Sequence, residues 1–209
     1  MTRLPLFPLR LVLFPSVPLP LHIFEERYRT MIARCLREDL PFGVVYHRGS
    51  ELSDIGCSAT VTQVVKRYDD GRMDIVAVGS ERFAIDRIDD SGIYLQADVR
   101  FLDTAPEDGE HESLHEHAIS ELLKYGYFAE IELHRATLNE LTTNQLSYLI
   151  AGVDLFGMDT KQELLEIEHA PTRLVRAVAA LEGVNARLAA TARIKRNLGA
   201  DFDLESLWN

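Results

Sequence analysis

The sequence has 209 residues, of which 46% are hydrophobic and 26% are charged, as in an ordinary globular protein. Its formal net charge of -11 argues against nucleic acid as the main partner, because phosphate binding depends on clustered Lys and Arg. The two cysteines, Cys35 and Cys57, have neither a CxxC nor a metal-ligand spacing, so we expect structural thiols in a reduced, cytoplasmic protein.

The N-terminal segment, residues 4–32, changes abruptly from a proline-rich apolar run into an amphipathic helix. Five prolines interrupt the apolar run: Pro5, Pro8, Pro15, Pro18 and Pro20. Proline fixes φ and has no N–H, so the run can be neither one long helix nor a central strand over its whole length. We expect an extended segment whose apolar side chains dock on the rest of the protein. Because Arg10 and the prolines break the run, we expect neither a signal peptide nor a membrane span.

The residues up to about 105 predict one helix and several short strands. Residues 24–36 carry an apolar face at helical spacing, and Pro41 ends this helix. An Asp-Gly pair at 70–71 indicates a hairpin turn, and a Gly-Ser pair at 79–80 indicates a turn or a bulge. The expected strands are residues 42–46, 55–68, 73–78, 82–88 and 93–101. Short strands with tight turns predict a meander that closes into a small barrel.

From about residue 106 the sequence pattern becomes helical. An acidic linker leads into a helix that we expect at about 110–129. A second helix, at about 143–153, follows Thr142 and Thr143, either of which can accept hydrogen bonds from the N–H groups of its first turn. The composition switch at this point therefore separates a β-rich first half of the chain from a helical second half.

Two more helices are expected towards the C-terminus. Thr160 and Glu163 have the spacing of a capping box, which predicts the start of a short third helix. Pro171 fits the first turn of a last helix, and Gly199 fits its end. Apolar residues recur along this last helix at helical spacing. Its apolar stripe can pack within the domain or form a homo-oligomer with a second copy.

The sharpest catalytic motif is HESLH at residues 111–115, which matches HExxH. On a helix, His111 and His115 could share a zinc ion, with Glu112 as general base. The motif stands at the start of a helix among acidic residues, where we expect a solvated face and not the dry cleft of a catalytic zinc site. His117 and Glu116 offer further ligands, but they fit the same solvated turn. We therefore assign no catalytic residue, no metal and no cofactor; His111, His115 and His117 are candidates only for adventitious metal capture.

Other catalytic motifs are absent from the sequence. There is no phosphate loop, no GxGxxG and no GxSxG, and none of the lysines follows a glycine. The sequence therefore predicts neither a nucleotide-binding site of the Walker type nor an activated serine.

Three segments, in order, resemble the Lon N-terminal domain family. They are LPLFPL at 4–9 with PLPLHIFEERYRTMI at 18–32, IGCSATV at 55–61, and DGRMDIVAVGSERFAIDRI at 70–88. The resemblance extends over nearly the whole chain. It implies an α+β fold, with a small β-barrel-like, PUA-like lobe containing one helix over residues 1–105. A helical lobe of the same domain follows over residues 106–209.

In ATP-dependent Lon proteases this domain is followed by an ATPase module and a Ser-Lys protease module, and it is credited with substrate capture. The present sequence contains neither catalytic module and resembles the stand-alone, single-domain members. The resemblance implies a non-catalytic module that binds unfolded polypeptide or a partner protein. We expect the binding surface to be an apolar groove where the proline-rich segment meets the two lobes, with Pro8, Phe14, Pro15 and Phe24 as candidate contacts.

Two alternatives stay open from the sequence. One is a zinc-dependent hydrolase that uses the HESLH motif. The other is an RNA-binding protein, suggested by the PUA-like fold; the net charge opposes it, although Arg34 and Arg37, and separately residues 193–196, form small basic patches. The sequence identifies neither the partner nor the oligomeric state.

Overall fold

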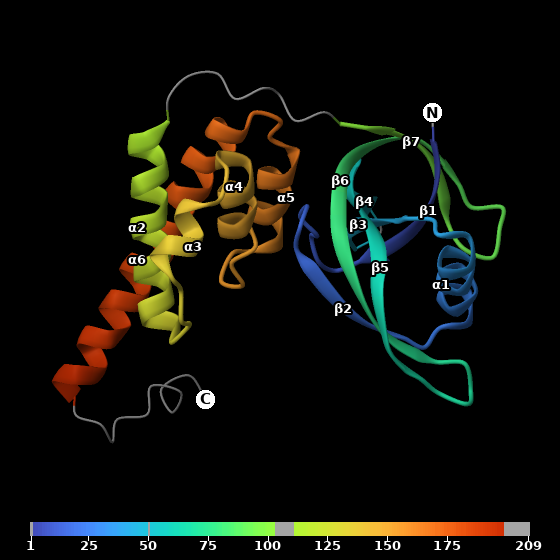
Figure 1. Ribbon diagram of the computed structural model, residues 1–209, viewed down its shortest axis with the longest axis horizontal. Coiled ribbons are helices and arrows are strands. Elements are labelled where there is room, and N and C mark those ends of the chain that lie inside the picture. The colour runs from blue at the N-terminus through green and yellow to red at the C-terminus, as the bar shows by residue number, and fades with distance from the viewer. Residues whose placement is uncertain (1, 50, 103–110, 199–209) are drawn as a thin grey trace.

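The computed structural model describes residues 2–49, 51–102 and 111–198, with side-chain burial up to residue 194. Two lobes lie side by side (Figure 1). The strands are β1 (Thr2–Leu9), β2 (Pro18–Ile23), β3 (Phe42–Arg48), β4 (Glu51–Leu52), β5 (Ile55–Arg67), β6 (Met73–Asp89) and β7 (Gln96–Phe101), and with helix α1 (Glu26–Glu38) they form the β lobe. The helical lobe contains α2 (Glu112–Ala129), α3 (Arg135–Asn139), α4 (Thr143–Ala151), α5 (Met158–Glu166) and α6 (Ala170–Leu198).

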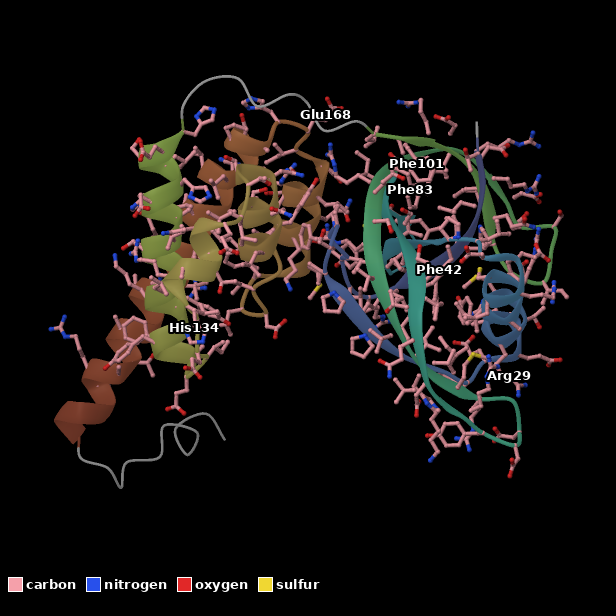
Figure 2. All side chains as sticks on the ribbon, in the orientation of Figure 1. Arg29, Phe42, Phe83, Phe101, His134 and Glu168 are labelled. Carbon is pink, nitrogen blue, oxygen red and sulfur yellow. The ribbon has the colours of Figure 1, made fainter. Side chains whose placement is uncertain are left out.

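The sheet of the β lobe closes on itself. Its strand order is β1-β7-β6-β5-β3-β4, and an additional pairing joins β1 to β3. The apolar face of α1 packs on this barrel, as its spacing predicts, through the buried residues Tyr28, Met31, Ile32 and Cys35. Figure 2 shows Phe42 and Phe83 in the interior of this lobe, where both are fully buried. The α+β fold and the small barrel expected from the sequence are thus confirmed.

The proline-rich segment is extended, as predicted, and apart from Leu6 its strands pair with one neighbour at a time. Residues 2–5 of β1 pair with β7, whereas residues 6–9 pair with β3. β2 pairs with β6, and Pro18 and Pro20 are both exposed. A strand that pairs on one side at a time tolerates the missing N–H groups of proline.

The segment between β1 and β2 contributes side chains to the cores of both lobes. Val12 and Phe14 belong to the core of the helical lobe, whereas Leu13, between them, belongs to the core of the β lobe. The ring of Phe14 lies 6.0 Å from that of Tyr148 on α4. An extended chain presents successive side chains to opposite sides, so this apolar segment contributes to both cores.

Gly79 lets this segment cross β6. Ser16 N–H donates to the Gly79 carbonyl at 2.8 Å, and Gly79 N–H donates to the Val17 carbonyl at 3.0 Å. A Cβ atom at position 79 would lie 2.2 Å from the Phe14 carbonyl oxygen, so only glycine fits. β6 runs uninterrupted through this point, and its register against β5 shifts between Cys57 and Ala59. Of the two predicted possibilities, turn or bulge, the bulge is therefore confirmed.

Some boundaries differ from the sequence prediction. β7 begins at Gln96, three residues after the predicted start of that strand at residue 93. β4 and α3 are two and five residues long, too short to leave a periodic pattern. The expected lobe boundary at residue 105 and the acidic linker lie largely outside the described residues.

The helical lobe confirms most of the predicted helices and corrects one cap. Thr142 caps α4, and it forms a capping box with Gln145. The capping box predicted at Thr160 is wrong, because α5 already starts at Met158, after Gly157. Pro171 lies in the first turn of α6, as predicted, whereas its predicted end, Gly199, lies outside the described residues. None of the described helices is long and apolar enough to cross a membrane.

Two buried arginines meet at the turn between α5 and α6, and one of them joins the lobes. Arg82 of β6 is 2% exposed, and its guanidinium donates to the carbonyls of Leu165 at 3.0 Å and Ile167 at 3.1 Å. Arg173 of α6 is fully buried and donates to the same Ile167 carbonyl and, at 2.9 Å, to Ser147 Oγ. Charge-assisted hydrogen bonds of this kind are roughly twice as strong as neutral ones.

Replacing Arg82 with lysine should destabilise the protein. We expect Arg82→Lys to lower the free energy of unfolding by about 2–3 kcal/mol, because the shorter lysine side chain cannot bring its ammonium group to the two carbonyls that Arg82 Nη1 reaches. Urea unfolding followed by circular dichroism measures this change. Arg87→Lys, at an exposed position of the same strand, is the matched control and should stay within about 0.5 kcal/mol of wild type. Equal stability of the two variants would contradict the role assigned to Arg82.

The two thiols should be inert in the folded protein. Burial raises the pKa of Cys57 to about 12 and that of Cys35 to about 11. Since the thiolate is the reactive form, less than roughly one thiol in a hundred is reactive at pH 8. We expect iodoacetamide to modify neither cysteine in buffer at pH 8 and both in urea, as measured by mass spectrometry. Rapid modification of either cysteine in the folded protein would show that this cysteine is not buried.

Candidate functional site

The four contacts predicted from the sequence do not gather on one surface. Phe14 is 1% exposed in the core, so it cannot touch a bound polypeptide in this conformation. Phe24, by contrast, is 59% exposed beside His22, with the two rings 6.0 Å apart. Pro8 lines a cavity of about 300 Å³ on the β lobe, whereas Pro15 lines a different cavity of about 390 Å³.

The cavity at Pro15 lies where the sequence analysis places the binding groove, between the lobes. Glu81 and Arg82 line it from β6, and Asn144 and Tyr148 line it from α4. It is therefore mainly polar, not apolar as expected, because charged, hydroxyl and amide side chains form much of its wall.

The HESLH motif does not form a zinc site with three ligands. Nε2 of His115 lies 2.8 Å from the Leu141 carbonyl oxygen, so this atom is already hydrogen-bonded to the backbone. Within residues 2–49, 51–102 and 111–198, the one group of three potential metal ligands contains neither His111 nor His115. It contains His117, the third histidine that the sequence analysis names, together with Glu121 and Glu182.

The predicted basic patch on α1 is partly neutralised by a neighbouring acid. Arg34 Nε lies 2.9 Å from one carboxylate oxygen of Glu38, and an Arg37 guanidinium nitrogen lies 2.7 Å from the other. Both ion pairs hold the pKa of Glu38 below its usual range. A phosphate group would have to compete with this carboxylate, which disfavours nucleic acid at this surface.

An open groove of about 640 Å³ lies between α2 and α6, and we name it the α2–α6 groove. The two helices run in the same direction here, since His117 contacts Glu182 and Glu121 contacts Asn185. The groove is lined by Ser120, Glu121, Leu123, Lys124, Tyr127 and Phe128 of α2, by Arg135 of α3, and by Glu182, Asn185, Ala186 and Ala189 of α6. Helical spacing brings each set onto one face of its helix.

The apolar lining of the α2–α6 groove consists mainly of aromatic side chains on α2 and of small alanine side chains on α6. Tyr127 and Phe128 stand edge to face, with ring centroids 5.5 Å apart, and Tyr127 is 79% exposed. Ala186 and Ala189 face them from α6 and leave the space open. Ile131, which follows α2, is 48% exposed. Exposed aromatic and aliphatic side chains beside a concave surface are typical of a protein-interaction site.

A buried carboxylate lies in the wall of this groove. Glu121 is 5% exposed; Lys124 Nζ donates to its Oε1, and Asn185 Nδ2 donates to its Oε2 at 2.9 Å. Burial by itself raises the pKa of this carboxyl, but the hydrogen bonds from Lys124 and Asn185 outweigh it and leave the pKa below the usual range. Asn185 Nδ2 also donates to the Glu121 carbonyl at 2.9 Å, so it ties α6 to α2.

The sequence analysis missed the α2–α6 groove, although one signal for it is present. Asn185 lies beside Val184 in the apolar stripe of the last helix, and an amide in such a stripe needs a buried polar partner. That partner, Glu121, is 64 residues away, so no local spacing reveals it.

Comparisons with known proteins agree with this architecture. Residues 3–183 match the family model described as ATP-dependent protease La (LON) substrate-binding domain. Lon protease 2 of Syntrophobacter fumaroxidans is 29% identical over 201 residues, which cover 86% of this chain and 25% of that protein. Lon protease of Cytophaga hutchinsonii is 26% identical, over 81% of this chain and 23% of its own length. The chain thus spans about a quarter of the length of the curated relatives it matches.

Solved structures show the same fold. The Lon N-terminal domain protein from Xanthomonas campestris superimposes with a TM-score of 0.70 at 22% identity, covering 86% of this chain and 98% of that one. The N-terminal domain of Mycobacterium avium complex Lon protease gives 0.71 at 19% identity, over 87% and 98%. The family match ends at residue 183, so Asn185, Ala186 and Ala189 of the groove lie beyond it.

Proposed function

Because the chain belongs to the LON substrate-binding domain family, we propose that it binds polypeptides without catalysing a reaction on them. The family match is to a substrate-binding domain, which supports a role in binding. The absence of a phosphate loop or an activated serine from the sequence, and the hydrogen bond that occupies His115, support the non-catalytic part of the proposal.

The observation that carries the proposal is the α2–α6 groove. Its volume of about 640 Å³ lies in the range of ligand sites, and its aromatic wall offers the kind of anchor that dominates binding energy at interfaces. An unfolded polypeptide differs from a folded protein in exposing apolar side chains, and Tyr127 and Phe128 can cover them. Lys124 and Arg135 in the lining can bind carbonyl groups of its backbone. We therefore assign an apolar segment of an unfolded polypeptide as the occupant.

Further candidate surfaces also belong to the proposal. Pro8 and Phe24 on the β lobe, with Pro15 between the lobes, remain candidate contacts, because none of them is fully buried. Self-association through α6 also remains a proposal, and it is supported by the exposure of Val175 and Ile194, which are 51% and 46% exposed.

The proposal is tested by the affinity for a permanently unfolded, carboxymethylated model protein that carries a fluorescent label. Fluorescence anisotropy should detect its binding, whereas the folded form of the same model protein should not bind. We expect Tyr127→Asp to weaken binding at least about tenfold, or about 1.4 kcal/mol, because it places a charge at the aromatic wall. Ala186→Phe, which fills the groove from α6, should weaken binding in the same way.

Ile93→Asp is the control, since Ile93 is an apolar residue that is 71% exposed on the other lobe and belongs to none of the candidate surfaces. It should bind like wild type. Failure of the wild-type protein to bind the unfolded model protein would refute the polypeptide-binding function. Loss of binding in Phe24→Asp but not in Tyr127→Asp would move the site to the β lobe and refute the assignment to the groove.

A further inference from the structure

A cluster of three potential metal ligands lies where α2 and α6 meet. One ring nitrogen of His117 and one carboxylate oxygen each from Glu121 and Glu182 lie within 4.8 Å of one another. From this arrangement we propose that the protein binds a divalent transition-metal ion such as Zn²⁺ between α2 and α6. This inference goes beyond polypeptide binding and does not rest on it.

The geometry suits a metal ion of this class. His117 and Glu121 are four residues apart on α2 and therefore lie on one face of the helix, one turn apart. Glu182 approaches from α6, and its Oε1 lies 2.9 Å from His117 Nε2. Ligand atoms about 2.0–2.2 Å from a zinc ion are roughly 3–4 Å from one another. The side chains of His117 and Glu182 are half exposed, at 50% and 49%, so they can separate by the small amount required.

The buried ligand is already held in place by a neighbour. Asn185 donates to Oε2 of Glu121, as the hydrogen-bonding partners behind metal ligands do, and this fixes the plane of the carboxylate. Asn185 is itself 6% exposed, and it lines the groove with Glu121 and Glu182. Its Oδ1 has no hydrogen-bond partner in the described part of the chain. A buried acceptor without a donor costs about 1–3 kcal/mol, and water carried by a bound metal ion can supply that donor.

Lys124 provides the positive charge at this cluster when no metal ion is bound. Its Nζ donates to Oε1 of Glu121, while its side chain remains 56% exposed. A metal ion that takes Oε1 must displace this ammonium group, and the long, exposed side chain can swing into solvent. The proposal therefore predicts that Lys124 competes with the metal ion. An adventitious histidine on the surface would have no such competitor.

The ligand set differs from the one that the HESLH motif suggests. His111 and His115 take no part, and the histidine one turn further along, His117, combines with a glutamate 65 residues away. An ion held between α2 and α6 also ties together the two helices that form the walls of the α2–α6 groove.

The experiment titrates Zn²⁺ into the untagged protein after treatment with EDTA, with isothermal titration calorimetry as the measurement. We expect about one ion per chain for wild type. His117→Ala and Glu182→Gln should each weaken binding at least about tenfold, because each removes a ligand. Lys124→Met should strengthen it several-fold. His134→Ala changes an exposed histidine at the start of α3 (Figure 2) and should leave the affinity unchanged.

Thermal unfolding in EDTA verifies that each variant is folded, and raised melting temperatures in Zn²⁺ provide a second readout of binding. The proposal is overturned if wild type binds no zinc. It is equally overturned if His117→Ala and Glu182→Gln bind zinc as tightly as wild type, which is the result for an adventitious ion only. An unchanged affinity in Lys124→Met would contradict the competition between the ammonium group and the metal ion.

Discussion

The carbonyl of Ile167 accepts hydrogen bonds from two buried guanidinium groups, and the arrangement of the lobes depends on it. Arg82 reaches it from the barrel and Arg173 from the first turns of α6. A buried guanidinium is stable only where its donors find acceptors, so Arg82 holds the α5–α6 turn against β6, while Arg173 ties the same turn to α4 and α6. This turn sets the direction in which α6 leaves the β lobe. Since α6 is one wall of the α2–α6 groove, this contact determines where that wall lies.

The proline-rich segment also holds the two lobes together. Its side chains alternate between the two cores, and Gly79 lets its backbone lie directly on β6. Phe14 therefore contributes to stability as a core residue of the helical lobe, although it belongs to the N-terminal segment. The two lobes share one chain segment and one set of buried hydrogen bonds, so a change at either should affect both.

Local patterns predicted most of the fold, because strands, turns and amphipathic helices are encoded by neighbours in the sequence. The hairpin turn at Gly71, the bulge at Gly79 and the cap at Thr142 all follow from local chemistry. The capping box expected at Thr160 failed because spacing alone does not show whether a residue has the extended backbone of a cap. α3 and β4 were missed because each is too short for a period to show.

The candidate sites were harder to predict, because long-range packing creates them. HESLH has a metal-binding spacing within five residues, yet His115 is bound to the Leu141 carbonyl of another segment. The cluster of His117, Glu121 and Glu182 has no sequence motif, since α6 supplies one of its ligands. The α2–α6 groove likewise combines residues that no local pattern connects, and part of its α6 wall lies beyond the family match.

Site-specific photo-crosslinking tests the central claim, that the α2–α6 groove binds unfolded polypeptide, most directly. A photoreactive amino acid is placed at Tyr127 and, in separate proteins, at Pro8 and at Phe24, and each protein is irradiated with the unfolded model protein. Mass spectrometry then locates the crosslinked products. We expect them mainly from position 127, beside the groove. Products from positions 8 or 24, with none from position 127, would contradict the account.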